Sequence, residues 1–176
     1  MADNYLENKM AEHMAGRRTV RRTVAGPVKF NPLRVLVAGC MLDIAEAVAE
    51  SFIAAGCRVA CLSDIQVAGA RCFSSQTGCR EAIGRLMHDW HEIDLLILTG
   101  DAPGVADALA EARRALPPAL RAKTPRAISV DSPCPGSLQL DTQAGATPQS
   151  VSRLCVLLAA PDAAPLFDRT AILRYR

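Results

Sequence analysis

Short apolar runs alternate with segments of helical periodicity along most of the chain, and this alternation strongly limits the possible folds. Arg34–Ala38, Arg58–Leu62 and Asp94–Thr99 are short runs rich in Val, Leu and Ile, which is typical of strands buried on both faces of a parallel sheet. Strands that alternate with helices indicate βαβ units. The sequence therefore predicts an α/β fold, with a doubly wound parallel sheet of about six strands and helices on both faces.

The other expected elements complete this pattern. Strands are expected at Arg71–Ser74, Ala127–Val130 and Thr170–Leu173, helices at Asp43–Ala55, Glu81–Trp90, Val105–Leu116 and Gln149–Ala159, and a loop from Pro133 to about Pro148. In open sheets of this class, ligands bind beyond the carboxyl ends of the strands, where the strand order reverses. A crevice is therefore expected at Gly39–Asp43, Ser63–Asp64, Thr99–Pro103 and Ser132–Gly136.

Residues 1–30 differ from the body of the chain, residues 31–176. They contain an expected helix at Asn4–Ala15 and carry six Lys or Arg against three Asp or Glu, whereas the whole chain has a net charge of +2. We expect this basic arm to be solvated or to pack on a neighbouring subunit of a homo-oligomer. Nucleic acid is not the expected partner, because the arm lacks interleaved aromatic residues. No apolar run reaches the ~18 residues of a membrane span.

The seven cysteines are odd in number, contain no Cys-x-x-Cys spacing, and accompany no visible export signal. They are interpreted as reduced thiols of a cytoplasmic protein. His88 and His91 are three residues apart on an expected helix, a spacing that also suits a solvated face, and no metal site is expected. Cys40 and Cys134 fall at the expected crevice, but no histidine is expected near either to serve as a base.

Four segments, in order, resemble the short-chain dehydrogenase/reductase family. These are Val35–Ala60, Asp94–Gly100, Val130–Pro135 and Val151–Leu173, which resemble the family's first βαβ unit, its Asp-Ile-Leu-Val-Asn-Asn-Ala-Gly strand, its Val-Ser-Pro-Gly-Pro loop and its C-terminal segment. The resemblance covers about residues 33–174. It implies a Rossmann-like, NAD(P)-binding-type domain.

Departures from the family pattern are concentrated in the phosphate loop. The family's Thr-Gly-x-x-x-Gly-Ile-Gly aligns with Ala38–Ala45, where only Gly39 and Ile44 match and Asp43 replaces the second glycine. That glycine normally lets the backbone approach the pyrophosphate. Asp43 is either part of a modified cofactor loop or an ordinary helix cap.

The resemblance implies a set of residues around NAD or NADP, neither of which is certain to bind. Asp64, at the end of the second strand, either binds a ribose or is a turn residue, and Asp101 is expected to cap the helix that begins at Pro103. The full set of implied cofactor-binding residues is Gly39, Cys40, Asp43, Ile44, Asp64, Thr99, Gly100 and Pro133.

The family's catalytic Tyr and Lys have no counterpart at their expected place. The chain has only two tyrosines, and Tyr5, which has Lys9 four residues later, lies in the N-terminal arm. The 33 steps along the chain from Thr99 to Ser132 are too few for the family's serine loop and Tyr-Lys helix, so one βα unit is missing. Ala127–Val130 is then either the fifth or the sixth strand, and if it is the fifth, Ser132 lies near the catalytic-serine position.

Three functions follow from these observations. The first is a shortened dehydrogenase-like domain without the Tyr-Lys chemistry, non-catalytic, with residual or lost NAD(P) binding. The second is an active NAD(P)-dependent oxidoreductase with an unconventional site or with groups supplied by a partner. The third is a protein-interaction scaffold that binds no nucleotide. The sequence assigns no catalytic residue.

Overall fold

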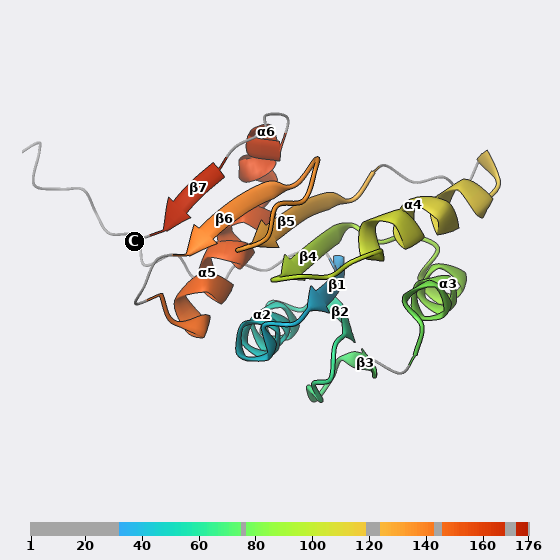
Figure 1. Cartoon of the computed structure of the whole chain (residues 1–176), viewed down its shortest axis with the longest axis horizontal. Helices are drawn as coiled ribbons and strands as arrows, with labels where there is room; N and C mark the ends of the chain where they lie inside the picture. Colours follow the sequence, from blue (N-terminus) through green and yellow to red (C-terminus); the bar gives the residue numbers. More distant parts are fainter. Residues whose placement is uncertain (1–31, 75–76, 119–123, 143–145, 168–171, 176) are drawn as a thin grey trace, which may run out of the picture.

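A computed structural model describes residues 32–74, 77–118, 124–142, 146–167 and 172–175, which form a three-layer α/β domain (Figure 1). The basic arm and its expected helix at Asn4–Ala15 lie outside the described residues. In chain order the elements are β1 (Arg34–Gly39), α2 (Leu42–Ala54), β2 (Arg58–Leu62), β3 (Arg71–Phe73), α3 (Cys79–Trp90), β4 (Leu95–Thr99), α4 (Val105–Ala115), β5 (Arg126–Val130), β6 (Leu138–Thr142), α5 (Pro148–Ala159), η2 (Pro161–Ala163), α6 (Ala164–Phe167) and β7 (Ile172–Tyr175).

The described strands form one parallel sheet of seven strands in the order β3-β2-β1-β4-β5-β6-β7. β1 pairs with both β2 and β4, so that Val35 lies opposite Val59 on one side and Leu95 on the other. The strand order therefore reverses at β1, which creates a topological switch point. The predicted doubly wound parallel sheet is confirmed, and β6 adds a strand within the stretch that was expected to be a loop.

Helices cover the two faces of the sheet because successive side chains of a strand point to opposite sides. Val35 and Val37 of β1 are buried with α2 and α5, whereas Leu36 and Ala38 are buried with α3 and α4. Figure 1 shows α2 beside α5 on one side of the sheet and α3 beside α4 on the other. These two apolar layers hold the carboxyl ends of β1, β2 and β4 in a fixed arrangement.

β6 is apolar on one face only. Leu138 and Leu140 are buried in the layer that contains α5. Gln139 and Asp141 are half-buried on the opposite face, where the Gln139 amide donates a hydrogen bond to the Asp141 carboxylate at 2.8 Å. This part of the sheet therefore presents polar side chains instead of an apolar surface for a helix.

Residues 131–137 join β5 to β6 directly, without a helix. Asp131 has a positive φ of 52°, which turns the chain back, and its carboxylate accepts hydrogen bonds from the backbone N–H of Thr142, at 2.6 Å, and from the Thr142 hydroxyl. The Ser137 hydroxyl donates to the carbonyl of Cys134 at 2.7 Å and lies 2.8 Å from the buried Ser129 hydroxyl. The short connection is thus fixed by its own hydrogen bonds.

Within the described residues, no single helix has both the length and the apolarity of a membrane span. Only α5 taken together with residues 161–167 meets that test by length and composition, and the two parts bend by 83° at their junction.

Candidate functional site

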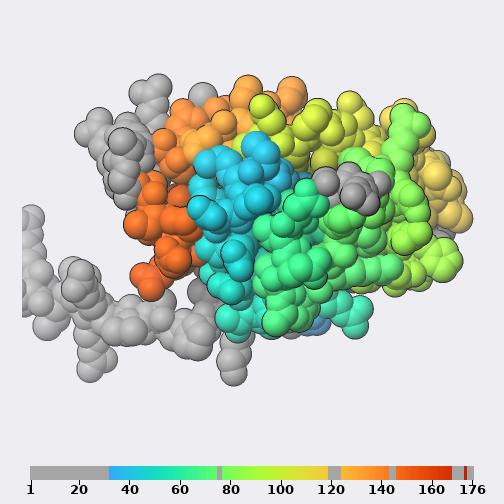
Figure 2. Space-filling model, turned by 60° about the horizontal axis from the view of Figure 1, so that its bottom comes forward, coloured from blue at the N-terminus to red at the C-terminus, as the bar shows by residue number. Residues whose placement is uncertain are grey.

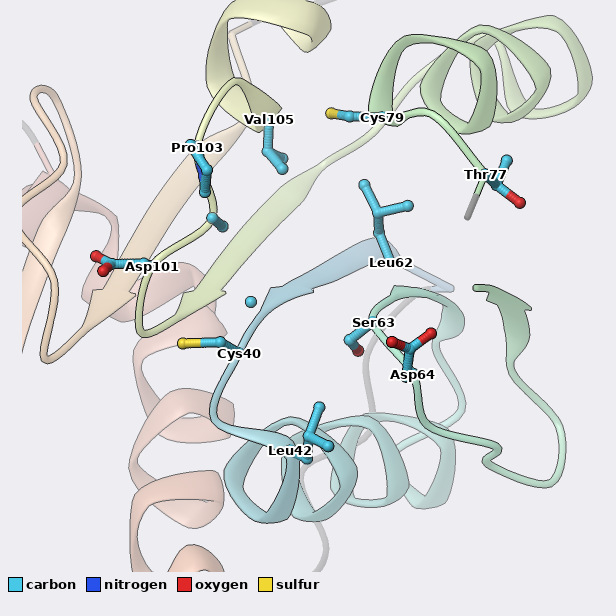
Figure 3. A pocket seen from close by; sticks show the side chains of 12 residues that line it. Cys40, Leu42, Leu62, Ser63, Asp64, Thr77, Cys79, Asp101, Pro103 and Val105 are labelled. Atoms are coloured by element: carbon cyan, nitrogen blue, oxygen red, sulfur yellow. The ribbon is translucent and has the colours of Figure 1, made fainter. Parts of the chain in front are cut away.

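Two neighbouring cavities lie at the carboxyl ends of the central strands. The first has a volume of about 540 Å³ and is lined by Gly39, Cys40, Leu42, Leu62, Ser63, Asp64, Thr77, Cys79, Asp101, Ala102, Pro103 and Val105 (Figure 3). The second has a volume of about 510 Å³ and is lined by Leu98, Gly100, Asp101, Ala102, Pro103, Gly104, Ala106, Asp107, Ser132, Pro133, Cys134 and Pro135. The segment after β4 lines both cavities and separates them.

Gly39 brings the loop after β1 against the end of β4. Its φ is +142°, and a Cβ atom at this position would lie 2.1 Å from the carbonyl oxygen of Thr99. The next turn is tied to the same carbonyl, because the N–H of Met41 donates to it at 3.1 Å. Gly100 is also required, since a Cβ there would meet Met41 Cγ at 2.8 Å and Cys40 Sγ at 2.9 Å.

The structure brings five of the eight implied cofactor-binding residues to the cavities. Gly39, Cys40 and Asp64 line the first cavity, and Gly100 and Pro133 line the second. These positions agree with the expectation that a crevice forms where the strand order reverses. Whether any of them binds a cofactor stays a prediction.

Ile44 and Thr99 are buried and line neither cavity. Ile44 packs in the apolar layer beneath α2. Thr99 is fully buried, and its hydroxyl donates to the carbonyl of Ala38 at 3.5 Å. Both residues support the loop from below, so their contribution to a site is structural.

Asp43 is not a helix cap, which corrects that interpretation. α2 begins at Leu42 with Met41 at the N-cap position and without a side-chain capping hydrogen bond. Asp43 is therefore the second residue of the first turn, and its side chain is exposed. A carboxylate there is favoured by the positive end of the helix dipole, although it makes no cap.

Asp101 does not cap the next helix either. The N-cap of α4 is Gly104 in a left-handed conformation, again without a side-chain hydrogen bond. The Asp101 carboxylate instead accepts a hydrogen bond from the Ser132 hydroxyl at 3.3 Å. It thereby connects the loop after β4 to the loop after β5.

Ser63 and Asp64 form the polar side of the first cavity. Figure 3 shows them together at the end of β2, with Asp101 on the opposite side and Leu62 between Ser63 and Cys79. Ser63 is only 6% exposed, and its hydroxyl has no hydrogen-bond partner among the described residues. A buried hydroxyl without a partner is costly unless a ligand or water supplies one.

Sequence reasoning missed Thr77 and Cys79 as lining residues. They stand at the start of α3. Helices in parallel α/β folds generally begin at the carboxyl edge of the sheet, and this tendency could have predicted both residues. Figure 2 shows α2 and the green segments that include α3 as neighbours on one face of the molecule. The first cavity therefore lies between the beginnings of three helices, α2, α3 and α4.

The thiols at the cavities have no histidine beside them in the described part of the chain. All seven cysteines are described and free. Cys40 and Cys79 line the first cavity and Cys134 the second, and no histidine is among the described residues that line either cavity. Burial raises the pKa of the Cys79 thiol, which keeps it protonated at neutral pH. Among the described residues, no group of three or more His, Cys, Asp or Glu side chains could hold a metal ion.

The charges around the first cavity do not match a pyrophosphate. α2, α3 and α4 each place their first residue on the cavity wall, and each carries its own carboxylate in the first turn, from Asp43, Glu81 and Asp107. No Lys, Arg or His is among the described residues that line either cavity. These acids weaken the attraction of the helix ends for phosphate, although Glu81 is itself ion-paired with Arg85. Since no cation on the cavity wall offsets them, the residues present do not fit the diphosphate of NAD or NADP.

Comparisons with known proteins find likeness in structure alone. No family model and no curated protein matches the sequence. A double mutant of a Serratia marcescens short-chain dehydrogenase/reductase aligns over 85% of this chain and 97% of its own, with a TM-score of 0.55 and 12% identity. BdcA in complex with NADPH aligns over 85% of this chain and 94% of its own, with a TM-score of 0.51 and 16% identity.

The fold is that of the short-chain dehydrogenases/reductases. A second double mutant of the Serratia marcescens enzyme agrees, with a TM-score of 0.57, 12% identity, and 85% and 98% of the two chains aligned. The predicted resemblance is confirmed at the level of the fold. Identities this low establish nothing about what the chain binds.

The sheet resolves which strand Ala127–Val130 represents. β5 is the fifth strand in chain order and β6 follows it directly through residues 131–137. In the family pattern the Tyr-Lys helix follows the fifth strand, and here no helix stands between β5 and β6. Ser132 lines the second cavity, and its hydroxyl donates to the Asp101 carboxylate.

Proposed function

We propose that this chain is a non-catalytic domain of short-chain dehydrogenase fold, in which Tyr-Lys chemistry has been lost and NAD(P) binding is weak or absent. The observation that carries the proposal is the direct connection of β5 to β6 through residues 131–137. This connection removes the element on which the family places its proton donor and the lysine beside it. Ser132 would stand nearest to the family's catalytic-serine position. Its hydroxyl donates a hydrogen bond to the Asp101 carboxylate, and no tyrosine takes that place among the described residues.

The polar outer face of β6 argues against a helix supplied by a partner. Gln139 and Asp141 occupy the face of β6 opposite α5 and bond to each other at 2.8 Å. An incoming helix would bury both side chains, and burial of polar groups without new partners is unfavourable. A partner helix that carries the proton-transfer groups of an oxidoreductase would therefore not bind at this face of β6.

Weak dinucleotide binding is supported by the phosphate loop. The exposed Asp43 carboxylate stands in the first turn of α2, next to Leu42 on the cavity wall. Two like charges a few ångströms apart repel, most strongly where water is partly excluded.

The seven free cysteines support the further proposal that the protein functions in a reducing compartment such as the cytoplasm.

Turnover and binding assays on the full chain test this proposal. We expect no hydride transfer between NAD(P)(H) and a panel of alcohols, aldehydes and ketones, and weak or no heat with NAD(H) and NADP(H) in calorimetry. Asp43→Gly should tighten NAD(P) binding by removing repulsion, because the glycine also restores the family's second phosphate-loop glycine. Turnover that is lost on Ser132→Ala would establish an active oxidoreductase and overturn the proposal.

A further inference from the structure

We propose that Cys61 and Cys72 form a redox-active pair, which a hydroperoxide oxidises to a reversible disulfide. The two thiols stand on the neighbouring strands β2 and β3, and neither lines a cavity. The proposed function gives them no role. The inference therefore goes beyond that function, and its test is independent of whether the chain binds a dinucleotide.

The sheet places the two thiols directly opposite each other. β2 and β3 are parallel, and their register pairs Cys61 with Cys72. Neighbouring strands lie about 4.8 Å apart, and disulfides bridge Cα separations of about 4.4–6.8 Å. Both thiols also pack in the same apolar layer, the one that contains α2. A bond between the two sulfur atoms therefore requires side-chain rotation and small adjustments, and no change of strand order.

The environments of the two sulfur atoms differ in a way that suits successive roles. Cys61 is fully buried, whereas Cys72 is half-buried. Burial raises the pKa of the Cys61 thiol to about 12, and the charge and hydrogen bond of Cys72 act in the same direction. The backbone N–H of Val67 donates to Cys72 Sγ at 3.5 Å. A small oxidant thus reaches Cys72 first, and Cys61 is the protonated thiol beside it.

The positions of the other thiols single out Cys61 as the partner of Cys72. Cys79, the next cysteine in the sequence, packs in the layer that contains α3, on the opposite face of the sheet. Cys57 packs on the same face as Cys61, but it stands four residues earlier, about 13 Å away along an extended chain. The remaining cysteines lie outside β2, β3 and their connection, at Cys40, Cys134 and Cys155.

The oxidation takes two steps, and the hydroperoxide is the oxidant in both. The Cys72 sulfur attacks an oxygen of ROOH, the O–O bond breaks, and ROH leaves with the thiol proton, so that Cys72 becomes a sulfenic acid. The Cys61 sulfur then attacks the Cys72 sulfur. The S–S bond forms, the S–O bond breaks, and the hydroxide leaves as water with the Cys61 proton. Two thiols have then given two electrons to the peroxide bond, and thiol–disulfide exchange with a small dithiol reverses the reaction.

The disulfide would connect the wall of the first cavity to the edge of the sheet. Cys61 precedes Leu62, Ser63 and Asp64, which line that cavity, and Figure 1 shows β3 at the edge of the sheet beside β2. The bond closes a loop over residues 62–71, and such a link restricts the open states of the loop. In reducing compartments disulfides are usually transient and often redox-sensing, so this wall is expected to stiffen on oxidation.

A peptide map of the full chain tests the pairing. The reduced chain is treated with hydrogen peroxide, blocked with N-ethylmaleimide and digested with trypsin without reduction. Cleavage after Arg58, Arg71 and Arg80 leaves Cys61 alone in residues 59–71, while Cys72 and Cys79 share residues 72–80.

We expect the loss of two of the seven thiols, a cross-link between these two peptides that fragmentation assigns to Cys61 and Cys72, and full recovery of both thiols in dithiothreitol. A disulfide that involves Cys79 in place of either residue would overturn the inference. So would oxidation of Cys72 to a sulfinic acid without any cross-link.

Three variants separate the roles of the sulfur atoms. Cys61→Ser should leave Cys72 as a sulfenic acid that dimedone traps, and Cys72→Ser should slow the oxidation of Cys61 at least tenfold, because only a buried thiol remains. Cys57→Ser removes another buried thiol from the same face and should change the rate of cross-linking less than twofold. Equal slowing by Cys57→Ser and Cys72→Ser would mean that opening of the whole domain sets the rate, and the inference would fail.

Hydrogen exchange tests the effect on the cavity wall. Backbone amides of residues 63–70 should exchange at least threefold more slowly in the oxidised chain, and dithiothreitol should restore the original rate. Unchanged exchange would overturn the stiffening of the wall. Neither this measurement nor the peptide map of the unaltered chain depends on a variant that folds.

Discussion

Gly39 is the residue on which the crevice depends most directly. A methyl group at this position would lie 2.1 Å from the Thr99 carbonyl oxygen, and φ is +142°. We expect Gly39→Ala to lower the free energy of unfolding by about 3 kcal/mol or more, because steric overlap and backbone strain add. Urea denaturation followed by circular dichroism measures this loss.

Gly56 provides the matched control for backbone strain alone. It also has a positive φ, +85°, but a Cβ there would meet nothing within 4 Å. Gly56→Ala should therefore cost only about 1–2 kcal/mol. Similar losses in the two variants would show that the close approach between Gly39 and Thr99 does not exist in solution.

Which residues reach the crevice could be predicted from sequence, but what their side chains do there could not. Gly39, Asp64 and Gly100 follow buried strands, so their place at the carboxyl edge follows from the strand pattern alone. Asp101 was expected to cap a helix, and Asp43 was expected either to belong to a modified cofactor loop or to cap one. Whether an acid caps depends on where a helix begins to within one residue, and α2 begins at Leu42, before Asp43.

At the scale of elements, β6 could not be predicted because two signals opposed it. Its alternation of Leu with Gln and Asp is short and follows Pro133–Gly136, a stretch typical of loops. Parallel neighbours also usually need a crossover of a dozen residues or more. The Asp131 and Ser137 hydrogen bonds replace that crossover with a compact turn, and such side-chain contacts between distant positions are invisible to periodicity.

Arg126 connects β5 to the end of α5, and we expect its loss to destabilise the C-terminal part of the sheet. Its guanidinium donates to the carbonyls of Ala159 and Ala160 at 2.6 and 3.3 Å and lies over the Phe167 ring at 5.3 Å. Arg126→Met keeps much of the apolar stem but removes these bonds. The expected loss is about 1–3 kcal/mol in the free energy of unfolding, measured by urea denaturation.

A charged residue on α5, the helix that Arg126 contacts, serves as the control for Arg126. Arg153 lies on α5 with its side chain exposed, so Arg153→Met should change stability by less than about 0.5 kcal/mol. If Arg153→Met cost as much as Arg126→Met, the loss would reflect net charge. The hydrogen bonds from Arg126 to the carbonyls at the end of α5 would then not be the cause of the lost stability.

At the scale of the whole molecule, charge is divided between the arm and the body. The first 30 residues carry six Lys or Arg against three Asp or Glu, while the chain as a whole has a net charge of +2. The body presents carboxylates at the carboxyl edge of its sheet, from Asp43, Asp64, Asp101 and Asp107. Opposite charges on separate surfaces favour association between copies of the chain, and screening by salt weakens it.

Deletion of residues 1–30 should therefore reduce the number of subunits in the oligomer. We expect the full chain to form a homo-oligomer at low salt in multi-angle light scattering, and the truncated chain to contain fewer subunits per particle at the same concentration. A full-length variant with Arg17, Arg18, Arg21 and Arg22 all changed to Gln separates charge from length, and it should behave like the truncated chain if charge drives assembly. The same number of subunits in all three proteins would exclude the arm from self-association and leave its basic residues to another partner.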